Sequence, residues 1–168
     1  KINDADLVEH LYAVGKSMGS DLDGVAKNTP SFFVWAIRDS YTAPLQRVQI
    51  IKGYVDSNGS PQEQVFDVAC SDGGSPDPVT YRCPDNNAKV DIANCAISQD
   101  VGDAELKAFW SDPTFEVDQR AFYYVRALEN PTCRWSTWDA IRNNVEPRPD
   151  MPKTIQERVW SSPIHYIP

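Results

Sequence analysis

Short hydrophobic runs separated by turn residues dominate the chain, and they predict strands more often than helices. Residues 31–38 are apolar on both faces and rich in aromatic and branched side chains, which indicates a central strand. Residues 47–55 alternate in part, and this alternation directs Val48 and Ile50 inward and Gln49 outward. Both segments therefore belong to the core of a sheet.

A hairpin is the expected continuation of the second strand. The segment 56–59 reads Asp-Ser-Asn-Gly, which is a strong turn signal. Residues 64–70 then alternate, with Phe66 on one face and Asp67 on the other. We expect the two strands to pair.

Helical patterns are few and short. One covers residues 6–14, and a second is expected from the capping residue Asp103 to Trp110. A third follows the capping residue Ser136 and runs to about residue 144. The remaining elements are strands at 120–129 and 154–160 and a tail from Pro163 onward.

The spread of 13 prolines and 8 glycines through 168 residues favours many turns and short elements. We expect a mainly β fold, an antiparallel β-sandwich that is immunoglobulin-like in the loose sense, with two or three short helices and long loops. Residues 1–168 are expected to form a single domain, within which residues 71–102 form a long loop.

Charge and hydropathy limit the partners. The net charge of −8 argues against binding to nucleic acid, which requires a basic face. No apolar run reaches the roughly 18 residues of a membrane span. The hydrophobic share of 41% is typical of a globular chain.

The four cysteines predict two disulfides. Their spacing lacks the close pairs of a zinc site, and an even number among polar loops indicates an oxidising compartment. Three pairings are possible; the favoured one joins Cys83 to Cys95, stapling the 71–102 loop, and Cys70 to Cys133. Four reduced, buried thiols are the alternative.

Two further patterns indicate catalytic residues only weakly. Residues 15–19 match the nucleophile-elbow pattern G-x-S-x-G at Ser17, with His165 downstream, but a helical pattern precedes the motif where a strand is required. His10 and His165 are more typical of surface or core histidines than of catalytic ones.

Acidic residues crowd the 71–102 loop. Calcium is a candidate ligand there, near Asp72, Asp77, Asp85 and Asp91, although the EF-hand spacing is absent. A solvated acidic loop is the simpler reading. No other cofactor is expected.

Aromatic and charged residues gather in the C-terminal third. They form either a ligand-binding or domain-docking surface or a flap that closes the core. The members of this candidate surface are Arg134, Trp135, Trp138, Glu157, Arg158 and Trp160.

Four motifs in order resemble a bacterial family of unknown function. They are D-V-A-C-S-D-G at 67–73, Q-R-A-F-Y-Y-V-R at 119–126, E-N-P-T-C-R-W-S-T-W-D at 129–139 and T-I-Q-E-R-V-W-S-S-P-I at 154–164. The chain resembles the C-terminal portion of the DUF3604 family over nearly its whole length. The family typically has proline and glycine where Ser17 and Ser20 stand and an aromatic residue in place of His165, which weakens catalytic roles for Ser17 and His165.

The resemblance implies a longer secreted, periplasmic or cell-envelope protein. Its upstream part resembles a PHP-type metal-dependent hydrolase, whose metal ligands would precede Lys1. Residues 1–24 would then be an incomplete N-terminal edge of a sheet, covered by the upstream segment or by a second copy in an edge-strand homodimer.

These observations lead to three alternative hypotheses about the function of the chain. The first is a non-catalytic accessory domain that contacts the missing N-terminal catalytic domain. The second is a stand-alone module that binds a small molecule or glycan through its exposed tryptophans. The third is a serine hydrolase centred on Ser17.

Overall fold

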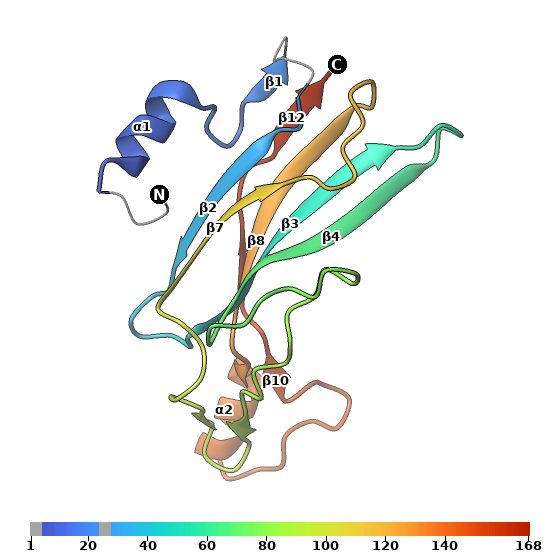
Figure 1. The fold of residues 1–168 in the computed structure, drawn as a ribbon. Coiled ribbons are helices and arrows are strands. Elements are labelled where there is room, and N and C mark those ends of the chain that lie inside the picture. Colours follow the sequence, from blue (N-terminus) through green and yellow to red (C-terminus); the bar gives the residue numbers. More distant parts are fainter. Residues whose placement is uncertain (1–4, 24–27) are drawn as a thin grey trace.

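The chain folds into two β-layers of unequal width in the computed structural model, which describes residues 5–23 and 28–168 (Figure 1). The larger sheet has the strand order β1-β12-β8-β3-β4, and β11 pairs with β8 next to β12. The strands of this sheet are β1 Asp21–Asp23, β3 Leu45–Val55, β4 Pro61–Cys70, β8 Ala121–Glu129, β11 Arg158–Trp160 and β12 Ile164–Ile167. Because β1 runs parallel to β12, the sheet is mixed, and the expectation of a purely antiparallel fold is wrong.

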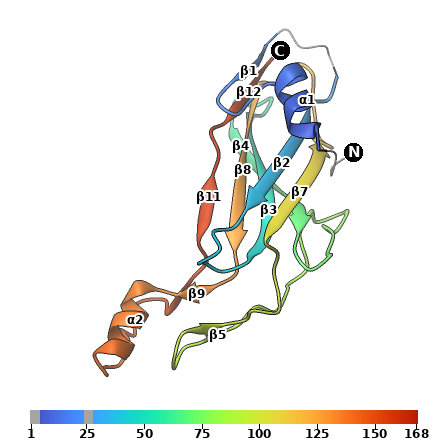
Figure 2. The same cartoon turned by 90° about the vertical axis from the view of Figure 1, so that its left-hand side faces the viewer.

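The second layer consists of an antiparallel pair, β2 Ser31–Ile37 and β7 Glu105–Ser111 (Figure 2). The helix predicted to begin at Asp103 is therefore wrong. Leu106 and Ala108 are buried while their neighbours in sequence face outward, which is a period of two. The prediction for β2 is right about the strand and wrong about its central position, because β7 is its one ladder partner among the described residues.

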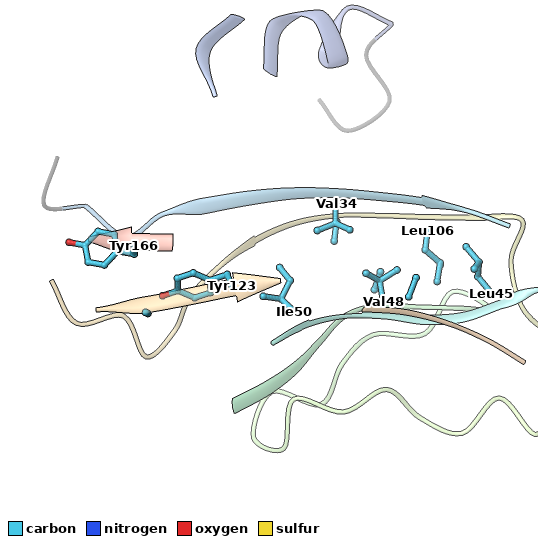
Figure 3. Close-up of a cluster of buried hydrophobic side chains, with 11 residues drawn as sticks. Val34, Leu45, Val48, Ile50, Leu106, Tyr123 and Tyr166 are labelled. Atoms are coloured by element: carbon cyan, nitrogen blue, oxygen red, sulfur yellow. The ribbon is translucent and has the colours of Figure 1, made fainter. Parts of the chain in front are cut away.

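The hydrophobic core lies between the two layers (Figure 3). Val34 of β2 faces Val48 and Ile50 of β3, and Tyr123 of β8 and Tyr166 of β12 extend the cluster along the large sheet. The predicted hairpin of β3 and β4 is confirmed. Val48 and Ile50 lie in the core as the alternation predicts, whereas a register shift between Val48 and Gln49 brings Ala69 of β4 into the core.

Gln49 lies on the face of β3 turned away from the core, as predicted, but that face is also covered and Gln49 is not solvent-exposed. Gln49 is 3% exposed and donates from Nε2 to Asp67 Oδ1 at 2.6 Å. Arg126 of β8 donates from Nε to Gln49 Oε1 at 2.7 Å. Polar side chains on adjacent strands thus satisfy Gln49 away from water.

The 71–102 loop is irregular apart from a small hairpin of β5 Val90–Asp91 and β6 Ala96–Ile97. Two disulfides are confirmed, but the favoured pairing is wrong. The first bridge joins Cys70 to Cys83, and the second joins Cys95 to Cys133.

Hydrogen bonds at the start of this loop explain the first bridge. The amide of Asp67 donates to the carbonyl of Tyr81 at 2.9 Å, and the amide of Cys83 donates to Asp67 Oδ2 at 2.7 Å. These bonds return the chain to the end of β4, where Cys83 meets Cys70. The bridges therefore hold the loop at its start and near its end instead of closing it on itself.

The C-terminal third begins with β9 Thr132–Cys133 and continues through α2 Trp135–Arg142 and β10 Thr154–Ile155, which pairs with β9. The predicted helix is confirmed, although it begins at Trp135, ahead of the predicted cap. The predicted last strand is divided between β10 and β11. Residues 164–167 are the strand β12 and not a tail, because Tyr166 fills the core.

The N-terminal helix α1 Leu7–Val14 is confirmed and has no buried residue. It lies outside the two layers on the β2 side (Figure 1). The predicted incomplete edge at 1–24 falls partly on residues 1–4 and 24, which lie outside the described residues, while β1 forms an outer strand of the large sheet. Within residues 5–23 and 28–168, neither helix has the length and apolar character to cross a membrane.

Candidate functional site

An apolar groove lies where β2 faces β11. Its volume is about 440 Å³, and the buried side chains Val34 and Ala127 line its floor. Three of the predicted surface residues, Glu157, Arg158 and Trp160, also line it. The structure thus brings this half of the predicted surface to one place.

The rim of the groove is hydrophobic and accessible. From β2 it includes Trp35 at 43% and Ile37 at 67% exposure, and from β11 Val159 at 64% and Trp160 at 55%. Single exposed apolar side chains are ordinary, whereas several around one groove beside a strand edge are typical of a contact surface.

Trp35 is oriented by charged residues of β7. Its Nε1 donates to Glu105 Oε2 at 3.0 Å, and Lys107 Nζ lies 4.1 Å from the ring centroid. Hydrogen bonds from Lys107 and then Trp35 hold the pKa of Glu105 below its usual value. The ring is therefore held at the groove by contacts on its outer face.

The other half of the predicted surface lies on α2. Trp135 is 72% exposed, and Trp138 is 39% exposed with the Arg142 guanidinium 5.7 Å from its ring centroid. Arg134 has a buried Nε with no hydrogen-bond partner among the described residues. Figure 2 shows α2 beyond the end of the sheets and β11 along β8, so the six residues form two patches and not one.

A cluster of arginines occupies the outer face of the large sheet, and the sequence reasoning missed it. Arg126 of β8 stands opposite Gln49 of β3 on one side and Trp160 of β11 on the other. In the next row, Leu128 of β8 lies between Arg47 of β3 and Arg158 of β11.

In the part of the chain that the structure describes, one carboxylate lies within ion-pair distance of arginines on this face. Asp67, whose side chain is 3% exposed, lies 3.9 Å from Arg47 Nε and 3.6 Å from Arg82 Nη1. Burial lowers the pKa of Arg47, Asp67 opposes this effect, and the positive charges of Arg126, Arg82 and Arg158 lower it further. We name Arg47, Arg82, Arg126 and Arg158 the arginine cluster.

A signal for the arginine cluster exists in the sequence. Arg126 occupies an alternating position of a strand whose other face is apolar, and Arg47 is next to the inward Val48. Only the strand order places these positions together.

The geometry around Ser17 does not resemble a nucleophile elbow. The helix α1 precedes Ser17 and the short strand β1 follows it, where the elbow requires a strand and then a helix. His165 pairs in register with Asp21, and its ring packs 6.1 Å from the Phe122 centroid. Among the described residues, no hydrogen bond joins Ser17 to a histidine or a carboxylate.

His165 also lines an open hollow of about 760 Å³ at the end of the large sheet. Arg120 and Glu63 share this lining, together with the ring of Phe122 above Gly53. The predicted roles of His165 and His10 as ordinary surface or core residues stay predictions.

The acidic residues of the 71–102 loop shape its turns. Asp77 Oδ1 accepts from the amides of Val79 and Thr80, and Asp85 and Asp91 accept from amides two residues ahead. Asp72 Oδ1 accepts from the amide of Gly102. In the part of the chain that the structure describes, no three His, Cys, Asp or Glu side chains come together as a metal site.

The family of the chain is shown by a comparison with known protein families. A family model described as "Protein of unknown function (DUF3604)" matches residues 1–168. The chain belongs to the DUF3604 family. No curated protein and no solved structure matches the chain. Membership in the DUF3604 family therefore indicates no reaction, and the surfaces of the domain are the evidence on its function.

Proposed function

We propose that this DUF3604 chain is a non-catalytic C-terminal accessory domain of a larger secreted or periplasmic metal-dependent hydrolase. The catalytic domain packs into the groove between β2 and β11. The fold that presents this groove is a loosely immunoglobulin-like β-sandwich. The accessible apolar rim of the groove is the observation that carries the proposal.

The edge of β2 adds main-chain recognition to the groove. Its ladder partner β7 occupies one side, and among the described residues no strand pairs with the other side. Such an edge offers a row of amides and carbonyls to a partner segment. The side chains of Ile37 and Val159 would then be covered together with the backbone.

The disulfides support the proposed compartment. Two bridges are consistent with an extracellular or periplasmic location. The first joins the 71–102 loop to β4 and the second joins it to β9, just before α2, so the domain would retain its shape outside the reducing cytosol.

Hydrogen exchange on the full-length natural protein tests the docking surface. Amides of β2 and β11 should exchange at least about tenfold more slowly in the full-length protein than in the chain by itself, because burial removes local opening. The β5–β6 hairpin serves as the internal reference. Equal exchange of β2 in both forms would overturn the proposal.

A matched pair of variants adds a second readout. Val159→Asp places a charge in the groove, whereas Val79→Asp places the same charge at a loop residue that is 81% exposed. In the full-length protein, V159D should restore fast exchange of β2 and V79D should not. If the chain alone forms a dimer that V159D dissociates, the groove binds a second copy and the catalytic-domain proposal is wrong.

The exposure of Trp135 supports a second candidate, a stand-alone small-molecule or glycan-binding module. At 72% exposure its indole is available for stacking on a sugar ring. Retardation of the chain by soluble polysaccharides in affinity gels, lost in Trp135→Ala but kept in Tyr41→Ala, would favour this reading. Equal mobility with and without polysaccharide would exclude it for the polymers tried.

A further inference from the structure

We propose that the outer face of the large sheet binds an oxyanion, a carboxylate, sulfate or phosphate group of a ligand, between Arg47, Arg126 and Arg158. The proposal concerns a surface separate from the floor of the groove and does not depend on the accessory-domain function. It rests on the strand register, the balance of charge and the exposure of the side chains.

The register directs three guanidiniums to one area. Arg47 and Arg158 stand on either side of Leu128, each one strand away, which separates their Cα atoms by about 9–10 Å. Arg126 lies two residues from Leu128 on the same strand and thus on the same face. Long side chains from these three positions can converge above Leu128.

The alternation of β11 separates this surface from nearby acids. Arg158 and Trp160, which also line the rim of the groove, share one face of the strand, whereas Glu157 occupies the opposite alternation and lines the groove with Glu129. Asp67 is the carboxylate that the structure places against the arginine cluster. Four guanidiniums and one carboxylate leave a local excess of positive charge in a chain whose net charge is −8.

The arginines retain donors for a ligand. Arg126 uses its Nε on Gln49, and Arg158 uses its Nε on the carbonyl of Gln156 at 3.4 Å. Arg47 donates through one Nη to Gln46. Because a guanidinium carries five N–H donors in a fixed fork, each of the three has donors left for a planar or tetrahedral oxyanion.

Partial burial strengthens the repulsion between the positive charges of the arginine cluster. The Arg47 side chain is 28% exposed, so its repulsion by neighbouring arginines is screened less than it would be on an open surface. An oxyanion bound among them would relieve this repulsion and form charge-assisted hydrogen bonds. Trp160, directly opposite Arg126 in the ladder, offers an apolar surface to the rest of the ligand.

NMR titration of the tryptophan indole signals tests the site. Sodium sulfate, phosphate and acetate are added separately at constant ionic strength, with sodium chloride as the reference, and Trp160→Phe identifies the Trp160 signal. A saturable shift of that signal with an oxyanion, absent with chloride, is the expected result. The order of the three affinities shows whether the site prefers a planar carboxylate or a tetrahedral anion.

Variants locate the binding. Arg126→Gln combined with Arg158→Gln should weaken oxyanion binding about tenfold or more, since each loses a charge-assisted contact. Arg120→Gln, an exposed arginine in the loop before β8, is the matched control and should bind as the unaltered chain does. Arg158→Gln alone, at an exposed position, serves if the double variant fails to fold. Equal shifts with chloride, or unchanged affinity in the arginine variants, would overturn the proposal.

Discussion

Replacing Lys52 by methionine should destabilise the fold severely, because the lysine forms a buried ion pair between the two layers. Lys52 Nζ lies 2.7 Å from Asp112 Oδ2, and the two side chains are 2% and 0% exposed. The hydroxyl of Tyr123 donates to the same carboxylate at 2.8 Å. Lys52 also donates to the carbonyl of Thr114 at 2.8 Å. The pair joins β3 and β8 of one layer to the end of β7 in the other.

The expected loss of unfolding free energy is about 3–5 kcal/mol, the usual cost of leaving one member of a buried pair uncompensated. For a chain of this size, that loss corresponds to a fall in Tm of roughly 6–20 °C. Lys107→Met is the control. Lys107 lies 3.1 Å from Glu105, which is half exposed, and its loss should cost about 1 kcal/mol or less.

The pH dependence gives a second signature. Burial would raise the pKa of Asp112, but hydrogen bonds from Lys52, Thr114 and Tyr123 outweigh it and hold the pKa below its usual value. Its stabilising contribution is therefore complete above the unfolded-state pKa of about 3.9 and is lost as the pH falls through the folded value.

In Lys52→Met the largest opposing hydrogen bond is absent, and we expect burial to outweigh the remaining hydrogen bonds from Thr114 and Tyr123, so that the pKa of Asp112 rises above its unfolded value. Acidification then protonates the buried carboxyl and relieves the variant. The deficit relative to the unaltered chain should be largest near pH 7 and should narrow towards about pH 4.

Urea unfolding followed by far-UV circular dichroism, at several pH values with the disulfides intact, measures both quantities. The double variant Lys52→Met with Asp112→Asn removes both charges and should recover at least half of the lost free energy. A loss in Lys52→Met below about 1 kcal/mol, or a deficit that stays constant between pH 7 and about pH 4, would refute the reasoning.

Two further predictions concern the backbone and the bridges. Replacing both Cys95 and Cys133 by serine should lower the unfolding free energy by about 4 kcal/mol in the chain-entropy model, and loss of the shorter Cys70–Cys83 bridge should lower it by about 3 kcal/mol. Peptide mapping of the non-reduced chain should recover Cys95 and Cys133 in one linked fragment. Any other linkage would contradict the structure. Gly53→Val should cost about 1–3 kcal/mol, because a Cβ at Gly53 would lie 2.2 Å from Cζ of Phe122. Trimming the ring in a Phe122→Ala background should make the same substitution nearly neutral, and an equal cost in both backgrounds would exclude that clash.

Local patterns in the sequence predicted an element correctly where its type depends on residues within that element or within one hairpin. The hairpin of β3 and β4 follows from alternation and a turn signal, α1 follows from helical spacing, and α2 was expected from a capping residue, although the helix begins one residue before it. Residues 105–111 could not be assigned in this way. Their few apolar positions fit a short helix as well as a strand, and the ladder with β2, distant in the chain, selects the strand.

The two patches of the predicted surface show the same limit. Sequence proximity and shared composition grouped Trp135 with Trp160, but the rest of α2 and the strand β10 lie between them, so that one is on α2 and the other on β11. Conversely, Arg47 and Arg126 are far apart in the chain and meet because β3 and β8 are neighbours. Proximity along the chain predicts proximity in space only within one element or one hairpin.

The sequence by itself determined the family, the mainly β character and the presence of two disulfides, since these depend on composition, alternation and the number of cysteines. The tertiary structure decided which cysteines pair, where the groove opens and which arginines share a face. Four cysteines permit three pairings, and only the return of residues 81–83 along β4 brings Cys83 to Cys70. Likewise Lys52 shares the inward alternation of Val48 and Ile50, but its burial depends on Asp112, the residue that follows β7, because a charge can be buried only where the fold provides its partner.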